Sequence, residues 1–290
     1  MITIVIPIHN REKYIKRTLD SIAASDFRPV KLILVNNGST DRSMDICQEF
    51  QLEHMDSDFS IYITEEHTPG ANHARNKGLL RCQSKYVYFF DDDDEFSPDF
   101  LSTFNSVLNN LLNQHKVPDM ICLNTNMDVQ GKMVIRDYHI PGSDAVCNQI
   151  LAGVLSTPSV IYRTDFLREI GGWNSKISAW QDWELGIRAL LHNPRLYWYR
   201  ARAFHTIYVH QASITGNNIT RNYKDSFNTI SEVRKLLDTY KKEIPAGSRW
   251  YIKPDIRRAR KALKYRRWIL WLKVHNLCPR GAWRIAMKTV

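Results

Sequence analysis

The stretch YVYFFDDDDE, residues 86–95, joins five strand-forming residues to five acids without a break. Its first half is typical of a buried strand, because aromatic and β-branched side chains favour sheets. Five adjacent acids repel one another, so a partner must compensate their charge. Alternate residues at a strand end point the same way, which would put Asp91 and Asp93 on one side. Two carboxylates suit Mg²⁺ or Mn²⁺, which keep positions open for phosphate oxygens.

Two other interpretations of this acidic run exist. A solvated acidic loop explains the charge alone, although a disordered acidic tail would not follow five strand formers. Phosphatases of the haloacid dehalogenase type also place an Asp-x-Asp after a strand. Their pattern carries Thr or Val where Glu95 stands here, and it lies near the N-terminus, so the resemblance to them is weaker.

Short runs rich in β-branched and aromatic residues precede this stretch and predict strands at residues 2–6, 31–35 and 60–64. Helix-type spacing of apolar residues lies between the predicted strands, at residues 12–24, 41–51 and 71–81. The alternation predicts parallel βαβ units. Ligands bind at the carboxyl ends of such strands, and polar clusters begin there at His9 and Asn36 as well as at Asp91.

The second half of the chain has a more mixed pattern. Helices are predicted at residues 98–113 and 181–191, and strands at residues 120–124, 133–139 and 197–204. Gly131 marks the turn of a hairpin between the first two of these strands. Beyond residue 220 the pattern is helical and basic. The predicted fold class is α/β: a Rossmann-like, mostly parallel nucleotide-binding sheet with a helical basic C-terminal extension.

The composition sets the protein class. Of 290 residues, 43% are hydrophobic and 24% are charged, which is ordinary for a globular protein. The net charge of +10 comes from the C-terminal segment, since residues 251–290 carry 12 Lys/Arg and one acid. The five cysteines are widely spaced without a C-x-x-C pair, which predicts reduced thiols in a cytoplasmic protein. No signal-peptide pattern and no run of about 18 apolar residues occur, so no membrane span is expected.

Four motifs in order resemble glycosyltransferase family 2, of the GT-A fold. They lie at residues 4–11, 35–41, 70–78 and 90–94. The match in order and spacing runs from residue 2 to about residue 95, and a weaker match continues to about residue 216. The resemblance implies a transferase domain over residues 1–216, with a nucleotide-binding half (1–95) and an acceptor half (96–216), followed by the helical basic segment 217–290.

The resemblance also implies roles at the donor site. His9 would stack on the nucleobase, and Arg75 would contact the diphosphate or base. Asn36 stands where the family usually has an Asp, and an amide can donate a hydrogen bond as well as accept one. The implied donor site also includes Pro7, Asn10, Arg11, Gly38, Asp91 and Asp92. Taken alone, each motif has a structural interpretation. His9 would be a structural histidine, Arg75 a surface arginine of a helix, and the segment at Asn36 a turn.

The implied metal site for Mn²⁺ or Mg²⁺ uses Asp91, Asp93, Asp94 and His210, with His205 as a competitor for the histidine position. A processive synthase would carry Gln-x-x-Arg-Trp, but Ala246 stands where that Gln would be, so a single sugar is expected to be added. Inversion at the anomeric carbon follows from the resemblance. Uridine is the first choice of donor base.

The second implied site lies on the predicted helix at residues 181–191. Asp182 takes the position of the family's catalytic base, and Gln181 replaces the usual neighbouring acid. Trp180 and Trp183 would form the acceptor site with Gln181, because flat apolar rings pack on sugar faces. An ordinary helix N-terminal acid that interacts with the helix dipole is the alternative reading of Asp182.

The basic C-terminal segment mixes cations with tryptophan and leucine. Seven residues could form an apolar stripe there: Ile256, Leu263, Trp268, Ile269, Leu270, Trp271 and Leu272. Such a segment suits an anionic membrane surface at residues 251–290, whereas a solvated helix packed on the core is the alternative. Nucleic acid is not expected, because no nucleic-acid-binding motif accompanies the charge.

Two functions from different classes follow. The first is a metal-dependent transferase that moves a sugar from a nucleotide-sugar donor to a glycan or lipid-linked acceptor. It would act in lipopolysaccharide, capsule or exopolysaccharide assembly, in the cytoplasm or on the inner face of the plasma membrane. The second is a catalytically inactive protein that binds nucleotide-sugars or polyanions. Asn36 and Gln181 favour the second, whereas the intact Asp91, Asp93 and Asp182 favour the first.

Overall fold

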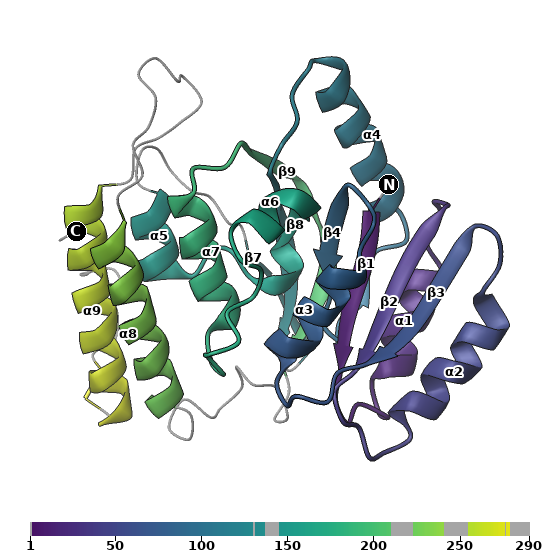
Figure 1. Cartoon of the computed structure of the whole chain (residues 1–290), viewed down its shortest axis with the longest axis horizontal. Coiled ribbons are helices and arrows are strands. Elements are labelled where there is room, and N and C mark those ends of the chain that lie inside the picture. Colours follow the sequence, from purple (N-terminus) through teal and green to yellow (C-terminus); the bar gives the residue numbers. More distant parts are fainter. Residues whose placement is uncertain are drawn as a thin grey trace. The chain divides into compact units, whose positions relative to one another are not determined.

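The computed structural model describes residues 2–129, 131–136, 145–209, 223–240, 255–275 and 277–278 (Figure 1). The chain forms two compact units, each assembled from separate stretches. The first unit comprises Met1–Asp137, Thr157–Ser175 and Leu196–Val209. The second comprises Tyr138–Ser156, Lys176–Arg195 and His210–Val290. The predicted domain boundary at residue 216 lies outside the described residues.

The first unit begins with the predicted alternation of strands and helices. Its first four strands are β1 (Ile2–Ile8), β2 (Val30–Asn36), β3 (Phe59–Glu65) and β4 (Tyr86–Phe89). The helices between them are α1 (Ile15–Ala23), α2 (Ser43–His54) and α3 (Ala71–Arg81). These strands are parallel in the order β3-β2-β1-β4, and Ile4 lies opposite both Leu32 and Tyr88. The strand order reverses beside β1, so the carboxyl ends of β1 and β4 border the crevice where α/β sheets bind ligands.

The same sheet continues beyond β4 with later parts of the chain. The added strands are β5 (Glu95–Phe96), β6 (Met120–Val129), β7 (Lys132–Arg136), β8 (Val160–Arg163) and β9 (Leu196–Val209). β8 pairs antiparallel with β4 and β6, whereas β9 runs parallel to β6 and antiparallel to β5. The predicted hairpin is confirmed, since β7 pairs antiparallel with β6 and Gly131 between them has a φ of +83°.

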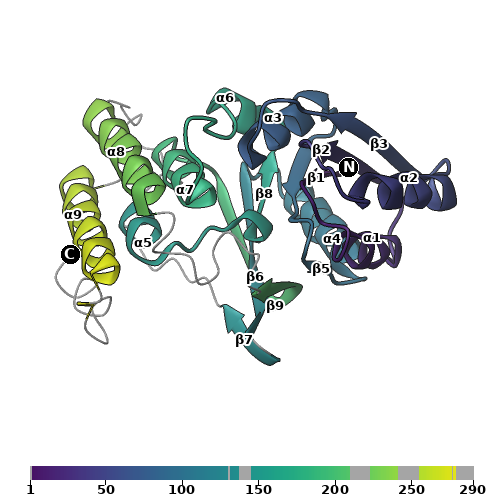
Figure 2. The same ribbon diagram turned by 90° about the horizontal axis from the view of Figure 1, so that it is seen from below.

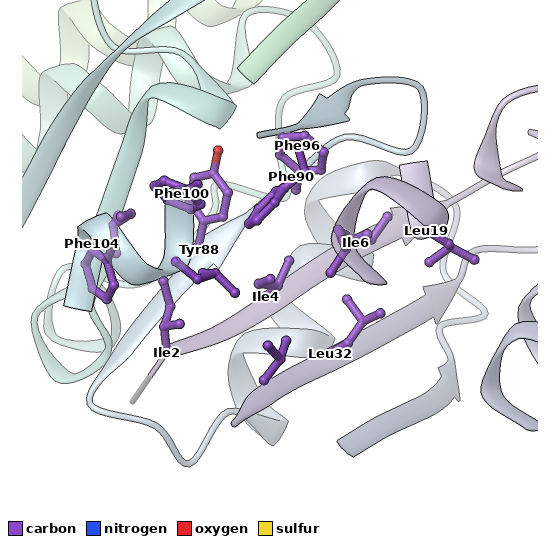
Figure 3. Packing of buried hydrophobic residues seen from close by; sticks show 14 of the residues in the cluster. Ile2, Ile4, Ile6, Leu19, Leu32, Tyr88, Phe90, Phe96, Phe100 and Phe104 are labelled. Atoms are coloured by element: carbon purple, nitrogen blue, oxygen red, sulfur yellow. The ribbon is translucent and has the colours of Figure 1, made fainter. Parts of the chain in front are cut away.

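Alternate residues of β1 supply the two faces of the sheet. Ile2, Ile4 and Ile6 point into a cluster with aromatic side chains of β4 and of α4 (Phe100–Asn113) (Figure 3). Val5 points to the opposite face, which α3 covers, while α1 and α4 lie on the other side (Figure 2). A Cβ atom on Gly78 of α3 would lie 2.2 Å from Cγ1 of Val5, so the helix approaches the sheet very closely. The short helices η1 (Thr157–Ser159) and α6 (Thr164–Glu169) flank β8.

The second unit contains four helices within the described residues. They are α5 (Ala145–Ala152), α7 (Gln181–Leu191), α8 (Tyr223–Thr239) and α9 (Ile256–Val274). α9 packs on α5 and α8, and α7 packs on the same two helices (Figures 1 and 2). The buried face of α9 consists of Ala259, Ala262, Leu263, Ile269, Leu270 and Leu272.

This packing corrects the predicted apolar stripe of the C-terminal segment. Four of its members, Leu263, Ile269, Leu270 and Leu272, are buried within the second unit, while Trp268 and Trp271 remain exposed. The stripe mixed two faces of one helix, because adjacent apolar residues in a helix point in different directions. None of the described helices is both long and apolar enough to cross a membrane. All five cysteines are free of disulfides.

Candidate functional site

The residues that follow β1 lie at the carboxyl edge of the sheet. Pro7 is buried within β1, whereas His9 and Asn10 beyond the strand are exposed. Nδ1 of His9 lies 2.8 Å from the carbonyl oxygen of Asn37, which fixes the ring beside the end of β2. Asn10 has a φ of 54°, and its Oδ1 accepts a hydrogen bond from the backbone N–H of Thr40 at 2.8 Å. The loops after β1 and β2 are therefore joined by side-chain contacts.

Asn36 ends β2 and is 9% exposed. Its Oδ1 accepts a hydrogen bond from the backbone N–H of Ser39 at 2.9 Å. A backbone N–H can only donate, so the side-chain atom of Asn36 that faces Ser39 must be the oxygen. The NH₂ group of the same amide is then left to donate to another partner. Gly38 has a φ of +72°, a conformation that favours glycine, and a Cβ there would meet nothing within 4 Å. The predicted turn thus presents an amide donor at the sheet edge.

The four aspartates Asp91–Asp94, here called the acidic turn, follow β4. The strand ends at Phe89, and Asp92 and Asp93 form a turn, so strand alternation does not set their directions. Asp94 is 2% exposed and Asp92 is 8% exposed, whereas Asp91 and Asp93 are less buried. Asp91 and Asp93 are therefore placed by a turn and not, as predicted, by the end of a strand.

Three arginines bind the acidic turn from α3, α1 and the loop after β1. Nε of Arg11 donates to Oδ1 of Asp92 at 3.1 Å and lies 3.6 Å from Oδ2 of Asp93. Nη2 of Arg17 donates to the backbone oxygen of Asp93 at 2.6 Å. Nη2 of Arg75 donates to Oδ1 of Asp91 at 2.9 Å. Buried carboxylates need such partners, so these arginines supply the compensation that the sequence required.

Burial changes the protonation of the acidic turn. It raises the pKa of Asp92 to about 7, with Arg11 opposing and with Asp93 and Asp91 adding to the rise. Burial also raises the pKa of Asp94 well above its usual range, helped by Asp91 and Asp93. The backbone N–H of Tyr208 opposes this rise, since it donates to Oδ1 of Asp94 at 3.1 Å. At neutral pH the turn therefore carries less than its full formal charge.

Arg75 is held by more than its ion pair. Its guanidinium lies 4.5 Å from the ring centroid of Trp173, and the residue is 6% exposed. Nδ2 of Asn76 donates to the carbonyl oxygen of Trp173 at 2.8 Å, and its Oδ1 accepts the Trp173 N–H at 2.8 Å. Gly172 has a φ of +64°, and a Cβ there would lie 2.7 Å from Oδ1 of Asn76. The segment from Gly171 to Asn174 thus positions Arg75 through Trp173.

Arg17 is a site residue that sequence reasoning missed. Its guanidinium lies 3.9 Å from the ring centroid of Tyr208, and Nε lies 3.3 Å from Oε1 of Glu95. Burial raises the pKa of Tyr208 to about 12, and Glu95 adds to the rise. Arg17 reads as a surface residue of a helix, and its contacts come from residues 76 or more positions away. No local pattern could have revealed them.

Two histidines, His205 and His210, were predicted as candidates for the metal site. His210 lies outside the described residues. His205 is 1% exposed and lies among the rings of Tyr88, Phe90, Phe96, Phe100 and Phe204. Neither of its ring nitrogens has a hydrogen-bond partner among the described residues, and burial lowers its pKa to about 3. His205 is therefore a core residue and not a candidate ligand.

Within the described part of the chain, no three His, Cys, Asp or Glu side chains are grouped as a closed metal site requires. The acidic turn nevertheless fits a divalent ion bound from one side. Mg²⁺ and Mn²⁺ in nucleotide sites need only one or two carboxylates, because phosphate oxygens and water complete the shell. Asp91 and Asp93 are the less buried carboxylates of the turn and fit this role best.

The predicted base and acceptor residues lie at the start of α7 in the second unit. Trp180 precedes the helix with a φ of 52°, which is a strained conformation for a bulky side chain. Asp182 and Gln181 are partly exposed in the first turn, and Oδ1 of Asp182 accepts the Trp183 N–H at 2.8 Å. Trp183 is 3% exposed, and its Nε1 donates to the carbonyl oxygen of Ile150 at 3.1 Å. Trp180 thus presents more ring surface than Trp183 does.

Arg266 of α9 joins this group, although no signal in the sequence separated it from the other basic residues of the tail. Its guanidinium lies 4.4 Å from the ring centroid of Trp180 and 5.6 Å from that of Trp183. Nη1 donates to the carbonyl oxygen of Leu151 at 3.1 Å. Burial lowers the pKa of Arg266 to about 10, and the charge of Asp182 opposes this shift. One residue of the basic tail therefore belongs to the candidate acceptor site.

Comparison with known proteins finds similarity in the first part of the chain. Residues 3–122 match the family model described as Glycosyl transferase family 2. The chain is 37% identical over 102 residues to Glycosyltransferase GlyA of Streptococcus pneumoniae, covering 35% of this chain and 14% of that protein. It is 34% identical over 116 residues to the Minor teichoic acid biosynthesis protein GgaB of Bacillus subtilis, covering 39% and 12%. The matched stretch spans well under half the length of these relatives.

Solved structures resemble nearly the whole chain. S. aureus TarS 1–349 in complex with UDP-GlcNAc has a TM-score of 0.67 at 17% identity, covering 94% of this chain and 72% of that chain. Mannosyltransferase PcManGT from Pyrobaculum calidifontis, in complex with GDP-Man and Mn²⁺, has a TM-score of 0.62 at 15% identity, covering 99% and 79%. At these identities the likeness shows the fold alone, and it confirms the predicted GT-A architecture.

Proposed function

We propose that this chain, which belongs to glycosyl transferase family 2 through its residues 3–122, transfers a single sugar from a nucleotide-sugar donor to an acceptor hydroxyl. The observation that carries the proposal is the acidic turn. Four aspartates lie at the carboxyl edge of the sheet and are held by Arg11, Arg17 and Arg75. Diphosphate groups bind where cations and a divalent ion can share their charge. This edge supplies three arginines and the aspartates that are proposed to hold such an ion.

The donor is proposed to be a nucleoside diphosphate sugar, with uridine as the first choice of base. The structural relatives solved with UDP-GlcNAc and with GDP-Man support this class of donor. His9 would stack on the base and the NH₂ of Asn36 would donate to it, with Pro7, Asn10 and Gly38 shaping the pocket. Arg75 and Arg11 would contact the diphosphate. An arginine donates several hydrogen bonds in a fixed fork, which suits phosphate oxygens.

The acidic turn is proposed to hold Mn²⁺ or Mg²⁺ through Asp91 and Asp93. Asp94 and His210 remain predicted contributors. When bound, the ion supplies positive charge to the diphosphate as negative charge develops on the leaving nucleotide. The relative solved with Mn²⁺ supports this proposal. Asp92 and Asp94 are buried and hydrogen-bonded, so their main part would be to support the turn.

Asp182 is proposed to accept the proton of the acceptor hydroxyl as that oxygen attacks the anomeric carbon. One displacement of this kind inverts the configuration at the carbon. The exposed side of Trp180 and the amide of Gln181 are proposed to bind the acceptor. The buried ring of Trp183 would pack against the ring of Trp180 and hold it in place. Their ring centroids are 5.5 Å apart in an edge-to-face arrangement.

The acceptor is proposed to be a growing surface glycan or a lipid-linked precursor of one. The relative named for teichoic acid biosynthesis supports this class of acceptor. Work at the inner face of the plasma membrane would bring the enzyme to such an acceptor. The alternative function is an inactive nucleotide-sugar or polyanion-binding protein, and the replacements Asn36 and Gln181 are what favour it.

Calorimetric titration tests the donor site. UDP and GDP are titrated into the full chain with Mn²⁺ and again with a chelator. UDP should bind more tightly than GDP, need Mn²⁺, and lose its affinity in Asp93→Ala. Asp165→Ala is the matched control, because its side chain is 81% exposed and lies outside the acidic turn.

Each outcome has a clear meaning. Binding of UDP that does not depend on Mn²⁺ would contradict the role of Asp91 and Asp93. Equal loss in Asp165→Ala would show a general effect of charge and not a site. If neither nucleotide binds, the inactive alternative in its polyanion-binding form becomes the better description of the protein.

A further inference from the structure

One face of α9 is exposed along the whole helix and is both basic and aromatic. Its residues recur every three or four positions, so they share one side of the helix. This basic stripe consists of Arg257, Lys261, Lys264, Trp268, Trp271 and His275. All six are exposed, and Trp268 and Trp271 are 47% and 45% exposed.

The opposite face of the same helix is used for folding. It packs on α5 and α8 through small and aliphatic side chains such as Ala259, Ala262 and Leu270. Arg260 on the flank pairs with Asp238 of α8 at 3.1 Å, and Arg266 stacks on Trp180. The helix is therefore fixed in the second unit by residues outside the stripe. The stripe itself is not what holds α9 in place.

The charged side chains of α9 are all basic. Residues 256–274 contain eight Lys/Arg and no Asp or Glu. A solvated helix usually mixes both signs, because opposite charges three or four residues apart stabilise it. Within α9 these like charges repel one another, while Asp238 of α8 pairs with Arg260. A surface that carries negative charge would relieve this repulsion.

The aromatic residues at one end of the stripe indicate which kind of negatively charged surface it binds. Trp268 and Trp271 follow the cations along the helix, and Leu277 just beyond it is 60% exposed. Tryptophan is enriched at the headgroup level of bilayers, where one part of the ring is apolar and the other is polar. Nucleic acids also bind cations and aromatic rings, but they gain little from an exposed leucine. A bilayer can bury all three side chains.

We propose that the basic stripe of α9 docks this protein on a bilayer that contains anionic lipids. Arg257, Lys261 and Lys264 would contact the headgroups, and Trp268 with Leu277 would reach the boundary of the acyl chains. Each Lys or Arg near an anionic surface strengthens binding by about 1 kcal/mol. Removing two of them should therefore weaken partition roughly 30-fold.

Vesicle flotation of the full chain tests the proposal. The vesicles contain phosphatidylcholine with phosphatidylglycerol, or phosphatidylcholine alone. The protein should float with the first and not with the second. Lys261→Gln with Lys264→Gln should weaken binding roughly 30-fold. Arg234→Gln with Lys235→Gln on α8 is the matched control, because it removes the same charge from exposed side chains of the same unit.

Point substitutions are used because deleting residues 251–290 would remove buried residues of α9 and disturb the second unit. A second measurement needs no variant: phosphatidylglycerol with brominated acyl chains should quench the tryptophan fluorescence of the wild-type protein. Equal flotation of the two double variants, or no quenching, would overturn the proposal. Retention by an oligonucleotide but not by vesicles would replace the bilayer with nucleic acid. UDP binding, measured in parallel, is independent of this surface, so failure here is distinct from failure of the donor site.

Discussion

The guanidinium of Arg266 lies 4.4 Å from the ring centroid of Trp180, which places a cation of α9 on the residue that precedes α7. Arg266→Met should lower the free energy of unfolding by about 2–4 kcal/mol, because it removes a desolvated cation–π contact and a hydrogen bond to Leu151. Urea denaturation followed by tryptophan fluorescence measures the loss. Arg257→Met is the control on the exposed side of α9, and its effect should stay within about 0.5 kcal/mol. Equal losses in both variants would show that the stacking contributes nothing.

His205 should give the protein a component of acid sensitivity. Burial lowers its pKa to about 3 from 6.5, so between these values the unfolded chain binds a proton that the folded chain does not. Lowering the pH through this window therefore favours unfolding, by up to about 1.4 kcal/mol per pH unit. His205→Phe should remove this component, because phenylalanine has no titratable group. The new ring would join an apolar aromatic cluster.

The comparison between variant and wild type is needed because Asp92 acts with the opposite sign. Its raised pKa stabilises the folded chain at low pH, and this contribution is lost as the pH rises toward 7. Stability measured by urea at several pH values should therefore diverge between wild type and His205→Phe below pH 6.5, the ordinary value for histidine. Parallel curves would mean that His205 is not held neutral in the folded protein.

Trp173 should affect donor binding although it is not itself proposed to touch the donor. Trp173→Leu removes the ring that packs on Arg75, so this arginine loses its fixed direction. UDP affinity should fall about 10-fold, which equals about 1.4 kcal/mol. Calorimetry measures the change, and Trp268→Leu on the exposed face of α9 should leave the affinity unchanged. Wild-type affinity in Trp173→Leu would argue that Asp91 and Asn72, whose Oδ1 accepts a hydrogen bond from Nη1 of Arg75 at 3.4 Å, suffice to orient Arg75.

A side chain at Gly78 should destabilise the protein while Val5 is present. A Cβ would lie 2.2 Å from Cγ1 of Val5, so Gly78→Ala should cost about 1–3 kcal/mol from overpacking, less about 1 kcal/mol gained in helix propensity. Val5→Ala removes the clashing atom, so the double variant should be more stable than the sum of the single losses predicts. Urea denaturation of the four proteins gives this coupling. A stabilised Gly78→Ala would contradict the close approach of α3 to β1.

Asp182→Asn should separate chemistry from donor binding. The amide cannot accept the proton of the acceptor hydroxyl, so turnover should fall by about 10²–10⁴-fold. Donor affinity measured by calorimetry should stay close to that of the wild type, because the donor site is built on other residues. The readout is release of the nucleotide from its sugar in the presence of acceptor. Wild-type turnover would show that another group is the base.

Local signals predicted the parallel half of the sheet well. Four short apolar runs and the helical spacing between them correspond to β1–β4 and α1–α3, and the bounds predicted for α3 and α7 agree with the structure. Each of these elements buries a continuous or periodic set of apolar side chains, so its pattern appears in the sequence itself. β8 was not predicted, and its residues Val160–Arg163 are held in the sheet by antiparallel pairing with β4 and β6.

The candidate site was predictable only in part, and for a physical reason. Motifs pointed to Asp91, Arg75 and Asn36, since those residues follow strand ends or open a helix. The contacts that hold them come from distant parts of the chain: Trp173 packs on Arg75, and the Tyr208 N–H binds Asp94. Such pairings depend on the tertiary fold, which no local window of sequence contains.

The second unit draws on three separated stretches of chain, and its last described helix, α9, packs on both α5 and α8. A ribosome therefore releases α5 and α7 long before the partner that closes their shared interior is made. During that interval their apolar sides need shielding, which is a task for a chaperone. For the same reason, a graft of this unit onto a related enzyme would have to exchange all three stretches together.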